Sequence, residues 1–194
     1  TSLETINATQ SNYTDAINIR QEIFQEMEKL STRILNAFDA TEAVSDLMVN
    51  DVKTIIRKIR GERKSKKILN PNPDEPQQIS ASQQSFTQQL EHFSLLIALV
   101  ATEPTYNPNE TELQNAQLNA FKTQLITINS NTINETTPYL NALQNRYNLL
   151  YATKTGLYDI AKEVKKYVKS VKTITLDVFR QISGIKFTRP KKKK

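Results

Sequence analysis

The sequence predicts an all-α protein, an elongated up-and-down bundle of about five helices. Apolar residues recur at three- and four-residue steps through several long segments, which is the spacing of a helix with one buried face. Glycine occurs only 3 times in 194 residues, whereas a β-rich fold needs glycine in its tight turns. Most of the 7 prolines fall in two polar stretches, 67–78 and 102–111, which we therefore interpret as loops between helices.

The first two predicted helices precede the proline-rich loop at 67–78. One covers residues 15–38, and the other runs from Thr41 to about residue 63, with Gly61 loosening its last turn. Each carries one apolar stripe that we expect to face the core: Ile23, Met27, Leu30, Ile34 and Phe38 in the first helix, and Val44, Met48, Val52, Ile55 and Ile59 in the second.

The third predicted helix follows a serine cap at Ser80 or Ser82 and carries the stripe Phe86, Leu90, Phe93, Ile97 and Val100. We expect it to be the most buried helix, because FSLLIALVA (93–101) is apolar almost all round. A long fourth helix follows the loop at 102–111. At about 40 residues it would reach roughly 60 Å, which favours an elongated fold. Because proline lacks a backbone N–H, we expect a kink or a short break near Pro138.

A last long helix is predicted over 157–182, between Gly156 and Gly184. Its apolar stripe is Leu157, Ile160, Val164, either Val168 or Tyr167, Val171 and Ile174, and its opposite stripe is Lys162, Lys165, Lys166, Lys169 and Lys172. A basic amphipathic helix of this kind can lie on an anionic lipid surface. A stripe that faces the core of the bundle is the simpler interpretation, because the apolar face is mostly small and β-branched and lacks tryptophan.

The net charge of +6 is confined to one end of the chain. Blocks 1–52, 53–67, 68–153 and 154–185 carry net charges of −6, +7, −5 and +4, which cancel. The whole surplus lies in 186–194. We therefore expect one helical domain over 1–185, followed by a basic tail over 186–194.

Two basic segments are the candidate binding sites, and both would act by electrostatic attraction to a polyanion, either a nucleic-acid backbone or an acidic protein. The candidate residues are Arg57, Arg60, Arg63, Lys64, Lys66, Lys67, Arg189, Lys191, Lys192, Lys193 and Lys194. Helical spacing predicts that Lys53, Arg57, Arg60 and Lys64 share one face. No aromatic residue is interleaved with the terminal lysines, so we expect contact with phosphates and no base stacking. One alternative is a structural, self-assembling homo-oligomer in which acidic and basic blocks of neighbouring copies meet. Two simpler interpretations stay open: the basic charges of 57–67 balance acidic charges of adjacent helices, and the lysine tail serves only solubility.

The sequence offers little material for catalysis, and we expect no enzymatic activity, cofactor or metal. Cysteine is absent, and His92 is the single histidine. It lies one step from Phe93, so we expect a flanking or partly exposed structural residue. A di-iron bundle needs Glu-x-x-His pairs on two helices, but residue 89 is Gln. Three isolated glycines cannot form a phosphate-binding loop. No run of about 18 apolar residues predicts a transmembrane helix.

Several stretches resemble a family of uncharacterised all-helical proteins of Bacteroidetes. These are NIRQEIFQEMEKLSTRILNA (18–37), ISASQQSFTQQLEHFSLLIALV (79–100), YNPNETEL (106–113), TGLYDIAKEVKKYVKSV (155–171) and QISGIKFTRP (181–190). The resemblance implies a helical fold and no established activity. It also implies a small loop that contains glycine, serine and proline after KSV. VKTITLDVFR (171–180) follows here without a helix breaker, so we expect the last helix to extend through it.

Overall fold

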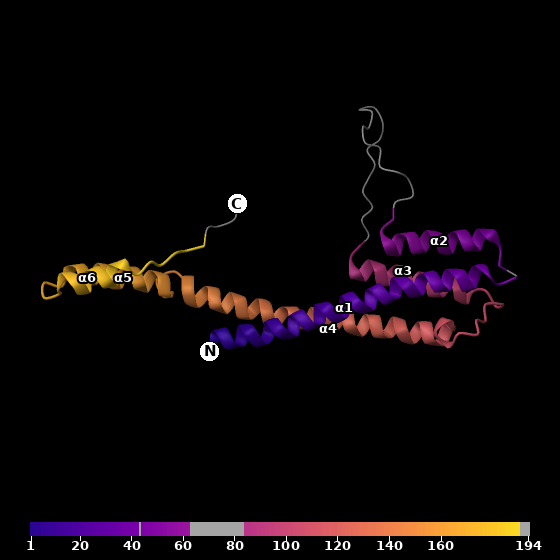
Figure 1. Cartoon of the computed structure of the whole chain (residues 1–194), viewed down its shortest axis with the longest axis horizontal. Helices are drawn as coiled ribbons and strands as arrows, with labels where there is room; N and C mark the ends of the chain where they lie inside the picture. Colours follow the sequence, from indigo (N-terminus) through magenta and orange to yellow (C-terminus); the bar gives the residue numbers. More distant parts are fainter. Residues whose placement is uncertain (43, 63–83, 191–194) are drawn as a thin grey trace, which may run out of the picture. The chain divides into compact units, whose positions relative to one another are not determined.

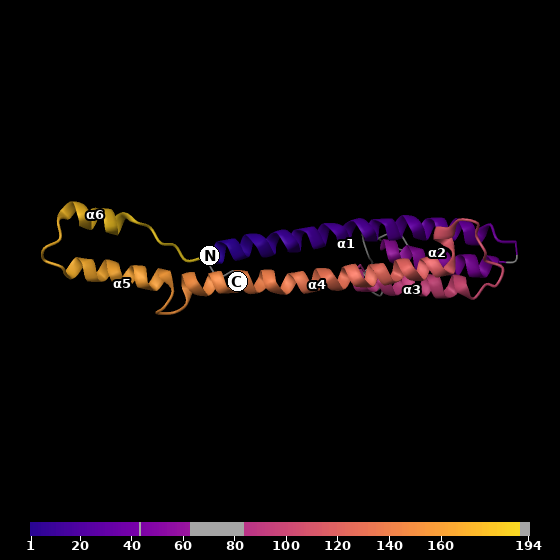
Figure 2. The same cartoon turned by 90° about the horizontal axis from the view of Figure 1, so that it is seen from below.

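The computed structural model describes residues 1–42, 44–62 and 84–190, and this part of the chain is helical with no β-strand (Figures 1 and 2). The all-α prediction is confirmed. The described residues form six α-helices where about five were predicted: α1 (Ser2–Asp39), α2 (Asp46–Arg60), α3 (Phe86–Ala101), α4 (Asn115–Tyr151), α5 (Leu157–Ser170) and α6 (Leu176–Gly184), with a 3₁₀ turn η1 (Thr111–Leu113).

The chain divides into two compact units. We call residues Thr14–Asn134 the core unit, and Thr1–Tyr13 together with Glu135–Lys194 the terminal unit. Helices α1 and α4 each contribute to both. The single helical domain predicted over 1–185 stays a prediction.

The core unit is held by one hydrophobic cluster to which four helices contribute. Its fully buried members include Met27, Ile34, Phe38, Val52, Ile59, Phe93, Leu96, Val100, Leu118 and Leu125. The stripes predicted for the first three helices therefore face this core, although Leu30, Val44, Met48, Ile55, Phe86 and Leu90 are only partly buried. Apolar burial of this kind supplies most of the free energy that holds such helices together.

Helix ends in the core unit follow from capping residues. The Ser45 side chain accepts a hydrogen bond from the Met48 N–H and starts α2. Gly61, with φ of 67°, ends it, because the N–H groups of Gly61 and Glu62 bond to the carbonyls of Lys58 and Arg57. The helix predicted to reach residue 63 thus stops at Arg60. Ser85 caps α3 by accepting from the Gln88 N–H, whereas Ser80 and Ser82 lie outside the described residues.

The fourth helix is not broken where an interruption was predicted. Helix α4 runs through Pro138, and a kink there stays a prediction. Pro138 is exposed, so water can bond to the backbone carbonyl that proline leaves without a donor. One residue further on, the Tyr139 ring stacks on Tyr13 of α1, which holds the flanking turns in place.

The prediction of one long final helix over 157–182 is wrong, because α5 ends at Ser170 and a separate helix, α6, begins at Leu176. The intervening VKTIT (171–175) holds four β-branched residues, which have low helix propensity, and both Val171 and Thr175 adopt extended backbone angles. The two helices form a hairpin, which Figure 2 shows most clearly.

The stripe of α5 that we expected to face a core is mostly exposed. Leu157, Ile160, Val164 and Tyr167 all lie at the surface, and only Val168 of the stripe is buried. The interpretation of this stripe as a core-facing surface is therefore wrong.

Candidate anion-binding surfaces

His92, the single histidine, is buried on α3 and not flanking or partly exposed as expected. The buried face of α3 is wider than the predicted stripe, because Gln89 and Leu96 are buried next to the stripe residues. Burial and the nearby Lys58 ammonium both lower the pKa of His92, so the neutral imidazole is favoured at neutral pH. Among the described residues, no three His, Asp or Glu side chains gather as a metal site would require.

Three cations predicted to share a face of α2 do so. Lys53, Arg57 and Arg60 line a shallow hollow of about 390 Å³ between α1 and α2, with Leu35, Asn50, Ile56 and Glu62. Arg60 also lines a hollow of about 310 Å³ beside it, together with Gln25, Glu28, Lys29 and Thr32 of α1. We call this surface, with its cations Lys29, Lys53, Arg57 and Arg60, the basic groove.

The cations of the basic groove differ in how far the fold already occupies them. The Arg60 guanidinium donates to Thr32 Oγ1 of α1 and pairs with Glu62 at 3.7 Å. Arg57 donates to Thr54 Oγ1 at 2.9 Å. Lys29 and Lys53 have no ion pair to any carboxylate in the described ranges. Arg60 therefore joins α2 to α1, whereas the hydrogen bond that Arg57 donates stays within its own helix.

Some of the cations of α2 also stabilise the helix by their position in its last turn. Arg57, Lys58 and Arg60 occupy the last turn of the helix, where positive charge offsets the partial negative charge of the unpaired carbonyls. Part of the basic segment is thus explained by helix stability. This explanation does not extend to Lys29 of α1 or to Lys53 in the middle of α2.

The other predicted anion-binding residues lie mostly outside the described residues. This is true of Arg63, Lys64, Lys66, Lys67, Lys191, Lys192, Lys193 and Lys194. Arg189 is described, and its guanidinium donates to the Tyr151 carbonyl at 2.8 Å, lies 3.8 Å from Asp159 Oδ2 and covers the Tyr158 ring. The first part of the predicted tail is therefore attached to the end of α4 and the start of α5.

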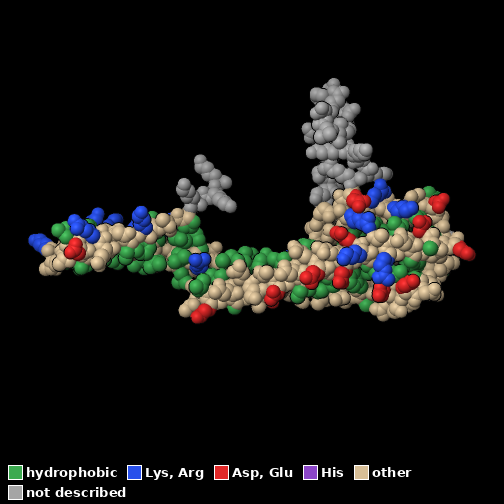
Figure 3. Space-filling model, in the orientation of Figure 1, with side chains coloured by type: hydrophobic (Ala, Val, Ile, Leu, Met, Phe, Trp, Pro, Cys, Tyr) green, Lys and Arg blue, Asp and Glu red, His purple; other side chains and the backbone are tan. Residues whose placement is uncertain are grey.

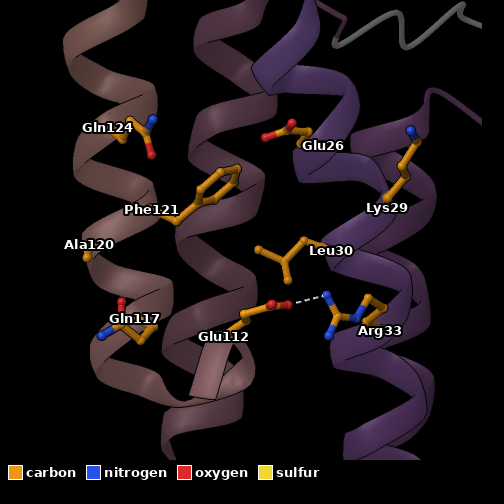
Figure 4. A pocket seen from close by; sticks show the side chains of 9 residues that line it. All are labelled: Glu26, Lys29, Leu30, Arg33, Glu112, Gln117, Ala120, Phe121 and Gln124. Atoms are coloured by element: carbon orange, nitrogen blue, oxygen red, sulfur yellow. Dashed lines mark hydrogen bonds and ion pairs between the residues drawn. The ribbon is translucent and has the colours of Figure 1, made fainter. Parts of the chain in front are cut away.

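A larger groove, missed by the sequence reasoning, lies between α1 and α4 in the core unit. It has a volume of about 580 Å³, and Leu30 and Phe121 point into the space between the helices (Figure 4). Charged groups lie at its edges, including an ion pair between Arg33 and Glu112. Glu112 is 79 residues from Arg33 in sequence, so no local pattern predicts their contact. The nine lining residues include no histidine or hydroxyl nucleophile.

Comparisons with known proteins add no functional assignment. No family model, curated protein or solved structure compared with the chain matches it. None of the described helices is both long and hydrophobic enough to cross a lipid bilayer.

Proposed function

We propose that this protein is a non-enzymatic binding protein that holds the phosphate backbone of a nucleic acid in its basic groove, on the scaffold of a helical bundle. The observation that carries the proposal is the convergence of Lys29, Lys53, Arg57 and Arg60 from two helices on two adjoining hollows. Phosphates are bound mainly by Lys and Arg, and each neutralised phosphate releases counterions.

The groove is suited to backbone contact and not to base recognition. It is shallow, its lining residues include no aromatic side chain for base stacking, and its cations follow one another along a helix face. The basic residues predicted beyond residue 62 and at the end of the chain would extend the same electrostatic contact.

The test is the binding of a fluorescent duplex DNA to the full chain over a series of salt concentrations, measured by anisotropy. We expect affinity to fall steeply with salt. The double variant Lys53→Glu with Arg57→Glu should lower affinity at least tenfold and reduce the salt slope by about one for each phosphate that is no longer neutralised. A chain that ends at Pro190 measures the contribution of the four terminal lysines.

A matched control reverses two charges outside the groove, with Lys122→Glu and Arg146→Glu, and should bind almost normally. Equal weakening by the control and the groove variant would contradict the proposal, because only net charge would then matter. Equally tight binding of polyglutamate would assign the groove to an acidic protein. Absence of DNA binding, with assembly that increases with protein concentration in light scattering, would favour the self-assembling alternative.

A further inference from the structure

The hairpin of α5 and α6 exposes several large hydrophobic side chains to solvent. Four apolar side chains of α5 lie on one face, and their exposed fractions are 50% for Leu157, 45% for Ile160, 49% for Val164 and 71% for Tyr167. On α6, Leu176 is 72% exposed and Val178 is 42% exposed, and no residue of this helix is buried. Large apolar side chains gathered on one exposed helix face are typical of an interaction site.

The same hairpin is cationic. Residues 157–184 contain six basic and three acidic side chains, a net charge of +3. Lys154, Lys186 and Arg189 flank the two helices. Figure 3 shows Lys and Arg side chains along one edge of this segment, with hydrophobic side chains gathered beside them. Lys166, Lys169 and Lys172 form no ion pair with a carboxylate in the part of the chain that the structure describes.

Three of the lysines lie on the side of α5 that faces α6. Lys165, Lys166 and Lys169 surround a hollow of about 210 Å³ that Val168, Phe179 and Ile182 also line. The Lys165 ammonium donates to the Ser183 carbonyl at 3.1 Å and lies over the Phe187 ring, so it holds the chain after α6 against α5. Helix α5 therefore has an exposed apolar face with lysines on its opposite face, which is the pattern of a helix that lies in a membrane surface.

The charge distribution discriminates between possible occupants of this surface. A second copy packed on the same face would bring a hairpin of net charge +3 against another of net charge +3, and like charges repel at close range. A nucleic acid would satisfy the lysines but would leave Leu157, Val164 and Tyr167 in water. An anionic lipid surface accepts both groups, because apolar side chains enter the boundary between headgroups and acyl chains while lysines contact lipid phosphates.

We propose that the α5–α6 hairpin docks on the surface of an anionic lipid bilayer, with Ile160, Val164 and Tyr167 inserted and Lys166 and Lys169 on the headgroups. This inference is independent of the proposed nucleic-acid function, because it uses the terminal unit, whereas the basic groove belongs to the core unit. The hairpin lies on the membrane and does not span it.

The experiment is co-sedimentation of the full chain with phosphatidylcholine vesicles that contain about 30% phosphatidylserine, compared with vesicles of phosphatidylcholine alone. We expect at least tenfold tighter binding to the anionic vesicles. The double variant Ile160→Glu with Val164→Glu should reduce that binding at least tenfold. Lys166→Glu with Lys169→Glu should do the same, and its residual binding should depend less on salt. Far-ultraviolet circular dichroism verifies that each variant keeps its helix content.

Matched controls carry the same types of substitution outside the hairpin. Leu47→Glu changes an exposed leucine of α2, and Arg146→Glu changes an exposed cation of α4; neither should alter vesicle binding. Lys53→Glu with Arg57→Glu should also bind vesicles normally, so failure of the two proposals can be told apart. Equal binding to both vesicle types, or full binding by the Ile160→Glu, Val164→Glu variant, would overturn the inference. If the unmodified chain dimerises without vesicles and the Ile160→Glu, Val164→Glu variant does not, the apolar face binds a second copy. That result would also overturn the inference.

Discussion

The rings of Tyr13 and Tyr139 stack with their centroids 5.0 Å apart and their planes inclined by 19°. The pair joins α1 to α4 one residue after Pro138, where α4 lacks one backbone hydrogen bond. We predict a coupling energy of about 0.5–1.5 kcal/mol between the two rings. A double-mutant cycle with Tyr13→Ala and Tyr139→Ala, followed by urea unfolding, measures it. Tyr167→Ala, a change at an exposed tyrosine, should alter stability by less than about 0.5 kcal/mol. A coupling energy of zero would mean that the stack does not hold these helices together.

Phe93 is fully buried on α3 and packs edge-on against Phe121 of α4. Phe93→Ala should lower the free energy of unfolding by about 3–5 kcal/mol, because it removes apolar contacts and leaves a cavity. Leu95→Ala on the same helix is the control, since Leu95 is 56% exposed. Chemical denaturation of the two variants should therefore give widely separated midpoints. Similar midpoints would contradict the placement of Phe93 in the core.

Gly61 ends α2 in the left-handed region of backbone space, with φ of 67°. A side chain in this conformation costs roughly 1–2 kcal/mol, so Gly61→Ala should destabilise the protein by about that amount. Gly184→Ala should be nearly neutral, since a Cβ at Gly184 would meet no atom within 4 Å. Thermal unfolding followed by circular dichroism compares the two. The prediction fails if Gly184→Ala is the more damaging change.

The pKa of His92 is lowered in the folded protein by burial and by Lys58. The unfolded chain therefore binds a proton at a higher pH than the folded protein does. The stability associated with neutral His92 is fully present above the unfolded pKa of about 6.5 and is lost as pH falls through the folded value. We expect the free energy of unfolding to decrease as pH is lowered from 7 toward 5.

A variant and a spectroscopic titration test this assignment. His92→Gln should remove the pH dependence in that range and leave only the carboxylate titrations at lower pH. Because the chain has one histidine, its imidazole NMR resonances report the pKa directly. Lys58→Met should raise that pKa, as it removes a nearby positive charge. An unchanged pKa in Lys58→Met would exclude the electrostatic part of the explanation.

Apolar spacing predicted the helices of the core unit because their buried stripes repeat locally. Ile34 and Phe38, for example, both lie in the core as expected. Helix ends were less predictable, because several serines near each helix start could serve as the cap. Ser45 caps α2 and Ser85 caps α3, and neither was predicted. The break after Ser170 had a signal in the β-branched run 171–175, but a continuous apolar stripe concealed it.

The candidate sites were only partly predictable. The shared face of Lys53, Arg57 and Arg60 follows from helical spacing alone. The addition of Lys29 depends on how α1 packs on α2, and no sequence pattern contains that information. Likewise, Arg189 reaches Tyr151 across 38 residues, so the local sequence of the tail could not indicate the contact.

Two of the three glycines cannot be replaced freely, and this gives a way to identify distant relatives. Gly61 has a positive φ, and a Cβ at Gly156 would lie 2.5 Å from the Ala152 backbone nitrogen. We expect homologues that share this fold to keep glycine at these two positions, even where the rest of the sequence has diverged beyond detection. A sequence search that gives extra weight to glycine at these two positions, with helical periodicity on either side, should find homologues that a search by overall identity misses.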